Sequence, residues 1–265
     1  MSEKKSGLVL DADMARRLRS ALTVSGAELF PLLQDPAGEV LRALLKNPRL
    51  SEDHVLALLK RRDLTEDLLK AISQLKLGEG SHRIKVALAK NPGTPGTVLL
   101  TILPQLYLFE LLELCYLPGV TPDQKVAAER VILQRLPTTA MGNKMTMARR
   151  GTVALVDALL KEGDFRLVEP CLQNPRLKEV SILQFLNGPH ATAETISAIA
   201  RHPRWKQRPN LRMTILKNRK TPAVWFTVFL PSLKTQDLHA LVASRRLTPG
   251  QKKLVDDELK RRGLA

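Results

Sequence analysis

Hydrophobic residues recur along the chain at the three- and four-residue spacing of one helix face. One such stripe covers residues 55–59, and the next covers residues 64–72. No segment shows the sustained alternation of apolar and polar residues that a strand would need. The predicted helices are short, about 8–13 residues, and helices of this length are unstable alone in water. We therefore predict an all-α fold in which short helices stack and bury their apolar faces on one another.

Short Asn-Pro and Thr-Pro motifs separate the predicted helices. Asn47–Pro48 and Asn91–Pro92 are 44 residues apart, and so are Asn174–Pro175 and Asn218–Arg219. Asn tolerates the left-handed backbone that closes a helix, and Pro cannot continue one. At Thr121–Pro122 the Thr side chain can cap the next helix while Pro takes its first position. These motifs predict regularly spaced helix ends.

The sequence repeats itself at an offset of 127 residues without a gap. The segment Lys46–Glu52 (KNPRLSE) returns as Gln173–Glu179 (QNPRLKE), and Thr121–Lys125 (TPDQK) returns as Thr248–Lys252 (TPGQK). Alignment of residues 10–136 on residues 137–263 gives 30 identities in 127 positions. We interpret this as an internal duplication.

These leucine-rich helical units, punctuated by Asn-Pro and Thr-Pro, resemble the leucine-rich-repeat variant family and, more loosely, HEAT-like repeats. The resemblance covers most of the chain and implies a curved α-solenoid with a concave binding face. It would comprise a tail at residues 1–9, a first unit at 10–136 and a second, strongly basic unit at 137–263, packed continuously with the first. The founding protein of the variant family is associated with an iron–sulfur cluster bound by a cysteine cluster. This sequence has no such cluster of cysteines, so we expect no iron–sulfur cluster and no other cofactor.

Motifs for catalysis or metal binding are absent from the sequence. It holds no Gly-rich phosphate loop, and its five histidines lack the spacing of metal ligands. We therefore expect no enzymatic activity. A remote alternative is a HEAT-like DNA glycosylase, in which Trp205, Trp225 and Asp237 would face the lesion. Trp225, however, lies in an apolar run and is expected in the core.

Cysteine usage and hydropathy predict a soluble, cytoplasmic protein. Cys115 and Cys171 are far apart and lack the C-x-x-C spacing, which fits buried free thiols in a reducing compartment. The N-terminus has no apolar stretch long enough for a signal peptide. Residues 98–117 are the most apolar region, but Pro104 and charged residues interrupt them, so no membrane span is expected.

Charge separates the two copies sharply. The chain carries a net charge of +16, of which residues 10–136 contribute +2 and residues 137–263 contribute +13. No acidic residue occurs between Thr195 and Gln236. Basic side chains and an interleaved Trp could hold phosphates and stack an unpaired base. The candidate residues are Arg201, Arg204, Trp205, Lys206, Arg208, Arg212, Lys217, Arg219 and Lys220.

This stretch predicts a polyanionic partner, with nucleic acid ahead of an acidic protein or anionic lipid headgroups. Because no motif that reads bases is present, the binding would be independent of sequence. The alternative is an ordinary basic surface on which Trp205 serves as a loop anchor.

A second difference is an apolar surplus in the first copy. The segment after Pro104 keeps the leucines shared with the second copy and adds apolar residues where that copy is polar. Such a surplus is either buried on both sides within the stack or available to a partner protein or a second copy of the chain. The candidate partner-binding residues are Tyr107, Leu108, Phe109, Leu112 and Leu117.

Overall fold

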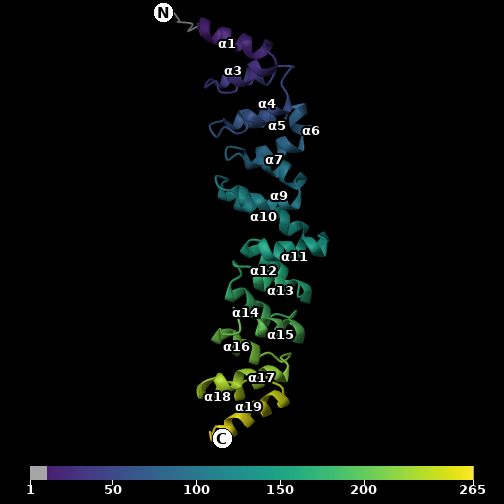
Figure 1. Ribbon diagram of the computed structural model, residues 1–265, viewed down its shortest axis with the longest axis vertical. Helices are drawn as coiled ribbons and strands as arrows, with labels where there is room; N and C mark the ends of the chain where they lie inside the picture. The colour runs from purple at the N-terminus through teal and green to yellow at the C-terminus, as the bar shows by residue number, and fades with distance from the viewer. Residues whose placement is uncertain (1–10, 265) are drawn as a thin grey trace, which may run out of the picture. The chain divides into compact units, whose positions relative to one another are not determined.

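The computed structural model describes residues 11–264, which form 19 α-helices, four short 3-10 turns and no strand (Figure 1). The predicted all-α class is therefore confirmed. The helices fall into two compact units that divide between Gln134 and Arg135. This division lies two residues before the boundary between the aligned segments 10–136 and 137–263.

The first unit contains ten helices. They are α1 (Ala12–Thr23), α2 (Leu29–Leu32), α3 (Gly38–Leu44), α4 (Glu52–Leu58), α5 (Glu66–Ser73), α6 (Lys76–Gly80), α7 (His82–Lys90), α8 (Gly96–Ile102), α9 (Leu108–Tyr116) and α10 (Pro122–Arg135). Within this unit α1 packs on α3, α3 on α5 and α5 on α7, while α4 packs on α7 and α7 on α9.

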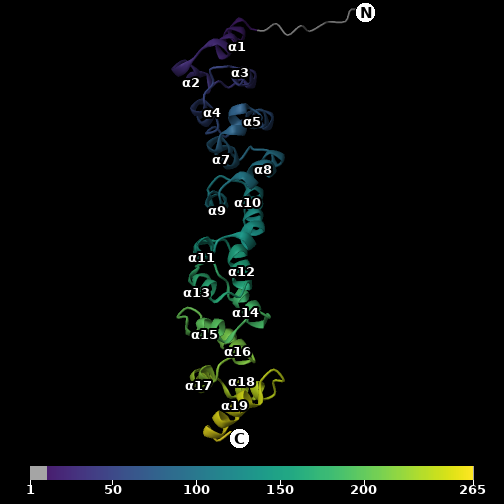
Figure 2. The ribbon, with the colours of Figure 1, turned by 90° about the vertical axis from the view of Figure 1, so that its right-hand side faces the viewer.

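The second unit contains the remaining nine helices. They are α11 (Met141–Arg150), α12 (Val153–Lys161), α13 (Phe165–Gln173), α14 (Glu179–Asn187), α15 (Ala193–Arg201), α16 (Pro209–Leu216), α17 (Ala223–Phe229), α18 (Thr235–Val242) and α19 (Pro249–Arg261). In Figure 2, α11, α13 and α15 lie on one side of this unit, and α12 and α14 lie on the other. On the first side α11 contacts α13 and α13 contacts α15. On the other side α12 contacts α14, and α14 contacts α16.

The core of both units is aliphatic, and helix α5 shows why. Its buried side chains, Leu68, Leu69 and Ile72, occupy one face, whereas Glu66 and Lys70 face solvent. Burying one such Leu or Ile contributes about 1.5–3 kcal/mol. A helix of only eight residues is therefore held by its neighbours rather than by its own hydrogen bonds.

Buried asparagines close the junctions between helices. Asn47 Nδ2 donates to the carbonyl oxygens of Ala21 and Val24, at 2.8 and 3.0 Å. Asn174 Nδ2 donates to the carbonyl oxygens of Ala148 and Gly151, at 2.9 and 3.1 Å. Asn47, Ala21 and Val24 each lie 127 residues before their counterparts Asn174, Ala148 and Gly151. Asn47 follows α3 and Asn174 follows α13, and their amides satisfy carbonyl oxygens at the C-terminal ends of α1 and α11, which have no partner within those helices.

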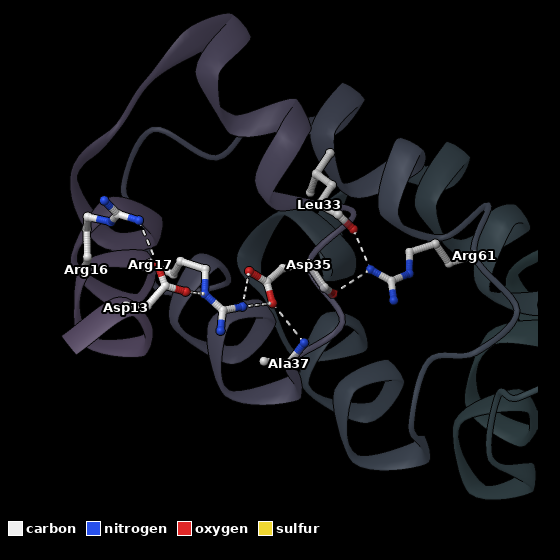
Figure 3. A network of polar contacts seen from close by, with 7 residues as sticks. All are labelled: Asp13, Arg16, Arg17, Leu33, Asp35, Ala37 and Arg61. Carbon is white, nitrogen blue, oxygen red and sulfur yellow. Dashed lines mark hydrogen bonds and ion pairs between the residues drawn. The ribbon is translucent and has the colours of Figure 1, made fainter. Parts of the chain in front are cut away.

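Asp35 and Arg17 form an ion pair in the first unit (Figure 3). Arg17 Nη1 lies 2.9 Å from both Asp35 carboxylate oxygens, and the carboxylate also accepts a hydrogen bond from the Ala37 amide. In the second unit Lys144 Nζ lies 3.0 and 2.8 Å from the two Glu162 carboxylate oxygens. Lys144 and Glu162 lie 127 residues after Arg17 and Asp35. The ion pair therefore recurs at the same offset, although both residue types have changed.

Candidate anion-binding cleft in the second unit

Trp205 is part of the core, contrary to the prediction that it stacks an unpaired base. Only 3% of its surface is exposed, and its Nε1 donates to the Leu172 carbonyl oxygen at 3.2 Å. The guanidinium carbon of Arg204 lies 4.3 Å from the centre of the Trp205 ring. The indole is thus covered by the protein itself, as in the alternative in which it anchors the loop.

Several of the predicted anion-binding cations hold the backbone of neighbouring loops. Arg204 donates to the carbonyl oxygens of Asn174, Pro175 and Leu177, at distances between 2.9 and 3.2 Å. Arg212 Nε donates to the Lys206 carbonyl oxygen at 2.6 Å. Part of the positive charge therefore has a structural role, because guanidinium groups supply donors that these loop carbonyls lack.

The nine predicted residues divide between the two ends of helix α16. Near its N-terminus lie Arg201, Arg204, Trp205, Lys206, Arg208 and Arg212. Arg208 Nη1 there lies 3.9 Å from Glu179 Oε2, and Arg201 Nε donates to Ser197 O within its own helix. At the C-terminus of α16 lie Lys217, Arg219 and Lys220. The structure thus separates residues that the sequence had grouped as one patch.

The C-terminal group lines a cleft of about 330 Å³. The cleft lies between the end of α14 and the end of α16, and the segment after α18 contributes Arg246. Four cations line it, namely Lys217, Arg219, Lys220 and Arg246, and among the described residues that line it none is acidic. An adjoining hollow of about 530 Å³ shares Lys217 and Arg246 and adds Arg245. Five cations therefore line the cleft and the adjoining hollow.

Some of these side chains are fixed by the backbone. Lys220 Nζ donates to the carbonyl oxygens of Pro189 and Ala191, at 3.1 and 2.8 Å. Arg219 Nε donates to the Arg246 carbonyl oxygen at 2.9 Å. Arg246 Nη1 donates to Asn187 Oδ1 at 3.1 Å. These hydrogen bonds hold the cations in place without neutralising their charge.

Lys217 differs from its counterpart in the first unit by lacking an acidic partner. The aligned Lys90 donates to Glu113 Oε1 at 2.7 Å. Ala240 stands at the position aligned with Glu113, and within residues 11–264 no carboxylate pairs with Lys217. As the C-cap residue directly after α16, Lys217 is favoured by the partial negative charge of the helix C-terminus. That effect accounts for one cation here but not for five.

The sequence reasoning missed Arg245 and Arg246. They lie outside the acid-free stretch, because Asp237 interrupts it. A signal was nevertheless available, since these residues replace Pro118 and Gly119 of the first copy. A position-by-position comparison of the copies would have found both.

The predicted apolar surface at residues 107–117 is only partly exposed. Tyr107 and Phe109 expose 68% and 45% of their surface, and Leu108 and Leu117 are half-buried. Leu112 exposes only 7%, so its assignment to a partner surface is wrong. Although the aligned His239 is exposed, Leu112 belongs to the buried face of α9 together with Leu111.

The residues proposed for a glycosylase differ in their surroundings. Trp225 is half-buried rather than fully in the core, and its Nε1 donates to Ser197 Oγ at 2.9 Å. Trp205 is buried, so it cannot face a lesion. Asp237 lines neither of the two cationic hollows.

The two cysteines are free thiols with little tendency to ionise. Burial raises the pKa of Cys115 to about 11 and that of Cys171 to about 12. Within residues 11–264, no group of three or more His, Cys, Asp or Glu side chains could hold a metal ion. No helix in the same range is long and apolar enough to cross a bilayer.

Comparison with known proteins supplies no relative from which a role could be transferred. The chain matches no protein-family model, no curated protein and no solved structure.

Proposed function

We propose that the protein is a non-enzymatic α-solenoid scaffold built from two tandem copies of one 127-residue unit, in the style of leucine-rich-repeat variant or HEAT-like proteins. The recurrence of the buried asparagine bonds and of the Arg17–Asp35 pair as Lys144–Glu162 supports the duplication. The sequence identities at the same offset support it independently.

We propose further that the second unit binds nucleic acid through its phosphates. One observation carries this proposal: the cleft at the ends of α14 and α16 is lined by four cations and by no acidic residue among those described. Each cation that contacts a phosphate releases counterions, which is the main source of affinity in sequence-independent binding. An arginine can also meet phosphate oxygens with two parallel hydrogen bonds.

The burial of Trp205 changes the kind of nucleic acid that is expected. Without an exposed indole beside the cations, stacking on unpaired bases contributes nothing at this loop. The cations offer contacts to the backbone alone. We therefore propose that duplexes bind at least as well as single strands of equal length, with little preference for sequence.

The test is fluorescence-anisotropy titration of labelled single- and double-stranded DNA and RNA with the full chain, from about 50 to about 300 mM salt. The cleft variant would carry Lys217→Gln, Arg245→Gln and Arg246→Gln. A matched control would carry Lys161→Gln, Arg149→Gln and Arg150→Gln, which remove the same charge elsewhere in the unit. The proposal expects a linear fall of log affinity with log salt, and a loss of affinity in the cleft variant much larger than in the control. Equal losses in both variants, or no binding at the lowest salt, would contradict it.

A further inference from the structure

The first unit carries a larger groove whose chemistry differs from that of the cationic cleft. The groove encloses about 810 Å³ and follows helices α4, α7 and α9. Its apolar floor consists of half-buried side chains that stay accessible in the folded unit. These are Leu56, Ala57, Val86, Ala87 and Leu117.

The three helices run parallel beneath the groove. Contacts join their N-terminal ends, because Arg83 Nη1 at the start of α7 lies 3.2 Å from Glu52 Oε2 at the start of α4. His82 Nε2 likewise lies 2.9 Å from both carboxylate oxygens of Glu110 at the start of α9. The C-terminal ends of α4 and α7, with Lys60 and Lys90, therefore lie together at the other end of the groove.

The groove occupies the position that is equivalent to the cationic cleft of the second unit. Leu59, Ala87, Lys90 and Asn91 line the groove, and Leu186, Thr214, Lys217 and Asn218 at the 127-residue offset line the cleft. The floor itself has changed. Where the groove has Ala57, Ala87 and Leu117, the second copy has Gln184, Thr214 and Ser244. Leu56 and Val86 remain apolar as Leu183 and Met213, so three of the five floor positions are apolar in the first unit only and are not required by the fold.

The cations along the groove have carboxylate partners except at Lys60 and Arg62. Arg83, His82 and Lys90 each contact a carboxylate of the protein, namely Glu52, Glu110 and Glu113 respectively. Lys60 is exposed, and within residues 11–264 it has no acidic partner.

Arg62 stands beside Lys60 at the same end and donates to the Gly119 carbonyl oxygen at 3.1 Å rather than to a carboxylate. Gly119 has a φ of 82°, and a Cβ at this position would collide with the Arg62 guanidinium. The glycine therefore permits the close approach that holds Arg62 at the groove.

We infer that this groove binds a short amphipathic helix of a partner protein, with its apolar face on the floor and its acidic residues at Lys60 and Arg62. Apolar anchors at helical spacing fit a floor that three parallel helices form. The two cations without a carboxylate require negative charge at one end of the occupant. Phe30, 44% exposed, lines the groove as well and offers a further apolar contact.

The experiment is selection of a phage-displayed library of random peptides, each about four helical turns long, against the immobilised full chain. Enriched peptides are then synthesised with a fluorophore and titrated with the purified protein. The floor variant combines Ala57→Gln, Ala87→Thr and Leu117→Ser, and the charge variant is Lys60→Asn. Each substitution introduces the residue that the second unit already carries at that position, so the fold is expected to tolerate them.

The inference expects enriched peptides with apolar residues at positions i, i+3 or i+4 and i+7 and with Asp or Glu at one end. The floor variant should bind them at least tenfold more weakly, and Lys60→Asn should weaken acidic peptides while sparing versions with Asn or Gln at the acidic positions. Three results would overturn it: no enrichment, enrichment of basic or patternless peptides, or equal binding to both variants and the unaltered chain. Circular dichroism of each variant distinguishes lost binding from lost folding.

Discussion

Lys90 Nζ lies 2.7 Å from Glu113 Oε1 in the first unit, whereas the aligned Lys217 of the second unit has Ala240 at the position of that glutamate. A lysine stands at both aligned positions, but only the first has an acidic partner among residues 11–264. In the first unit the charge is neutralised within the protein. In the second, among residues 11–264, no carboxylate pairs with it, and Arg245 and Arg246, which stand where the first unit has Pro118 and Gly119, line the same hollow. The loss of the acidic partner, together with these two added arginines, distinguishes the lining of the cleft from that of the groove.

The first prediction concerns Trp205. Replacement of Trp205 by Phe removes the donor to the Leu172 carbonyl and part of the buried ring. We expect the free energy of unfolding to fall by about 1–3 kcal/mol, because a buried acceptor loses its partner. Nucleic-acid affinity should remain within about twofold, since the indole is covered. Urea unfolding and anisotropy on the same preparation check both outcomes. A variant of unchanged stability that loses affinity for single strands would restore the stacking role.

The second prediction concerns the buried asparagines. Asn47→Ala and Asn174→Ala each leave two carbonyl oxygens at a buried junction without this donor. Each variant should lower the free energy of unfolding by about 1–3 kcal/mol. Asn210→Ala serves as the control, because Asn210 is exposed. Thermal or urea unfolding measures all three. If the exposed control lost as much stability as the buried variants, the asparagine bonds would not be what holds these junctions.

The third prediction concerns pH and helix α19. Glu258 pairs with Arg261 and Arg262, at 2.8 Å in each case, and the hydrogen bond from Arg261 lowers the pKa of the carboxyl group. Its contribution to stability is therefore complete above the unfolded-state pKa of about 4.3 and is lost as pH falls through the lower folded-state pKa.

The Glu258→Gln variant should accordingly be less stable than the unaltered chain near neutral pH, by at most about 1 kcal/mol because the arginines are partly exposed. The difference from the unaltered chain should shrink once the pH falls below about 4. Urea unfolding at a series of pH values measures it. A difference that stayed constant down to the lowest pH would mean that the substitution disturbs packing rather than an ion pair.

The helices could be predicted from the sequence because a helical stripe is set by residues that are close together along the chain. The stripe at residues 64–72 is buried as expected. The left-handed backbone expected of asparagine at helix ends is wrong, because among residues 11–264 only glycines have a positive φ, and Asn47 instead bonds carbonyl oxygens at the end of α1. Trp205 was harder to interpret, because the aligned Gly78 carries no side chain to indicate whether the position faces the core. The prediction for Leu112 was wrong for a related reason. Whether a side chain is buried depends on the helix packed against it, and the exposure of the aligned His239 gives no information about that packing.

The cationic cleft could not be predicted as a site from spacing alone. Its residues come from the ends of α14 and α16 and from the segment after α18, so that Asn187 and Arg246 are 59 residues apart yet hydrogen-bonded. Only the packing of the helices brings these ends together. The acid-free stretch indicated the right unit, but it grouped residues that α16 holds at opposite ends.

The most direct test of the anion-binding account restores the missing partner in the second unit. Ala240→Glu recreates at Lys217 the pair that Lys90 makes with Glu113, and Ala193→Glu adds the same charge at an exposed position at the start of α15. Duplex DNA affinity is measured for both across the same salt series. The account predicts that Ala240→Glu weakens binding and reduces the slope of log affinity against log salt by about 1 or more. Ala193→Glu should change the affinity and this slope little. Equal effects of the two substitutions would show that only net charge matters and would contradict a cleft centred on Lys217.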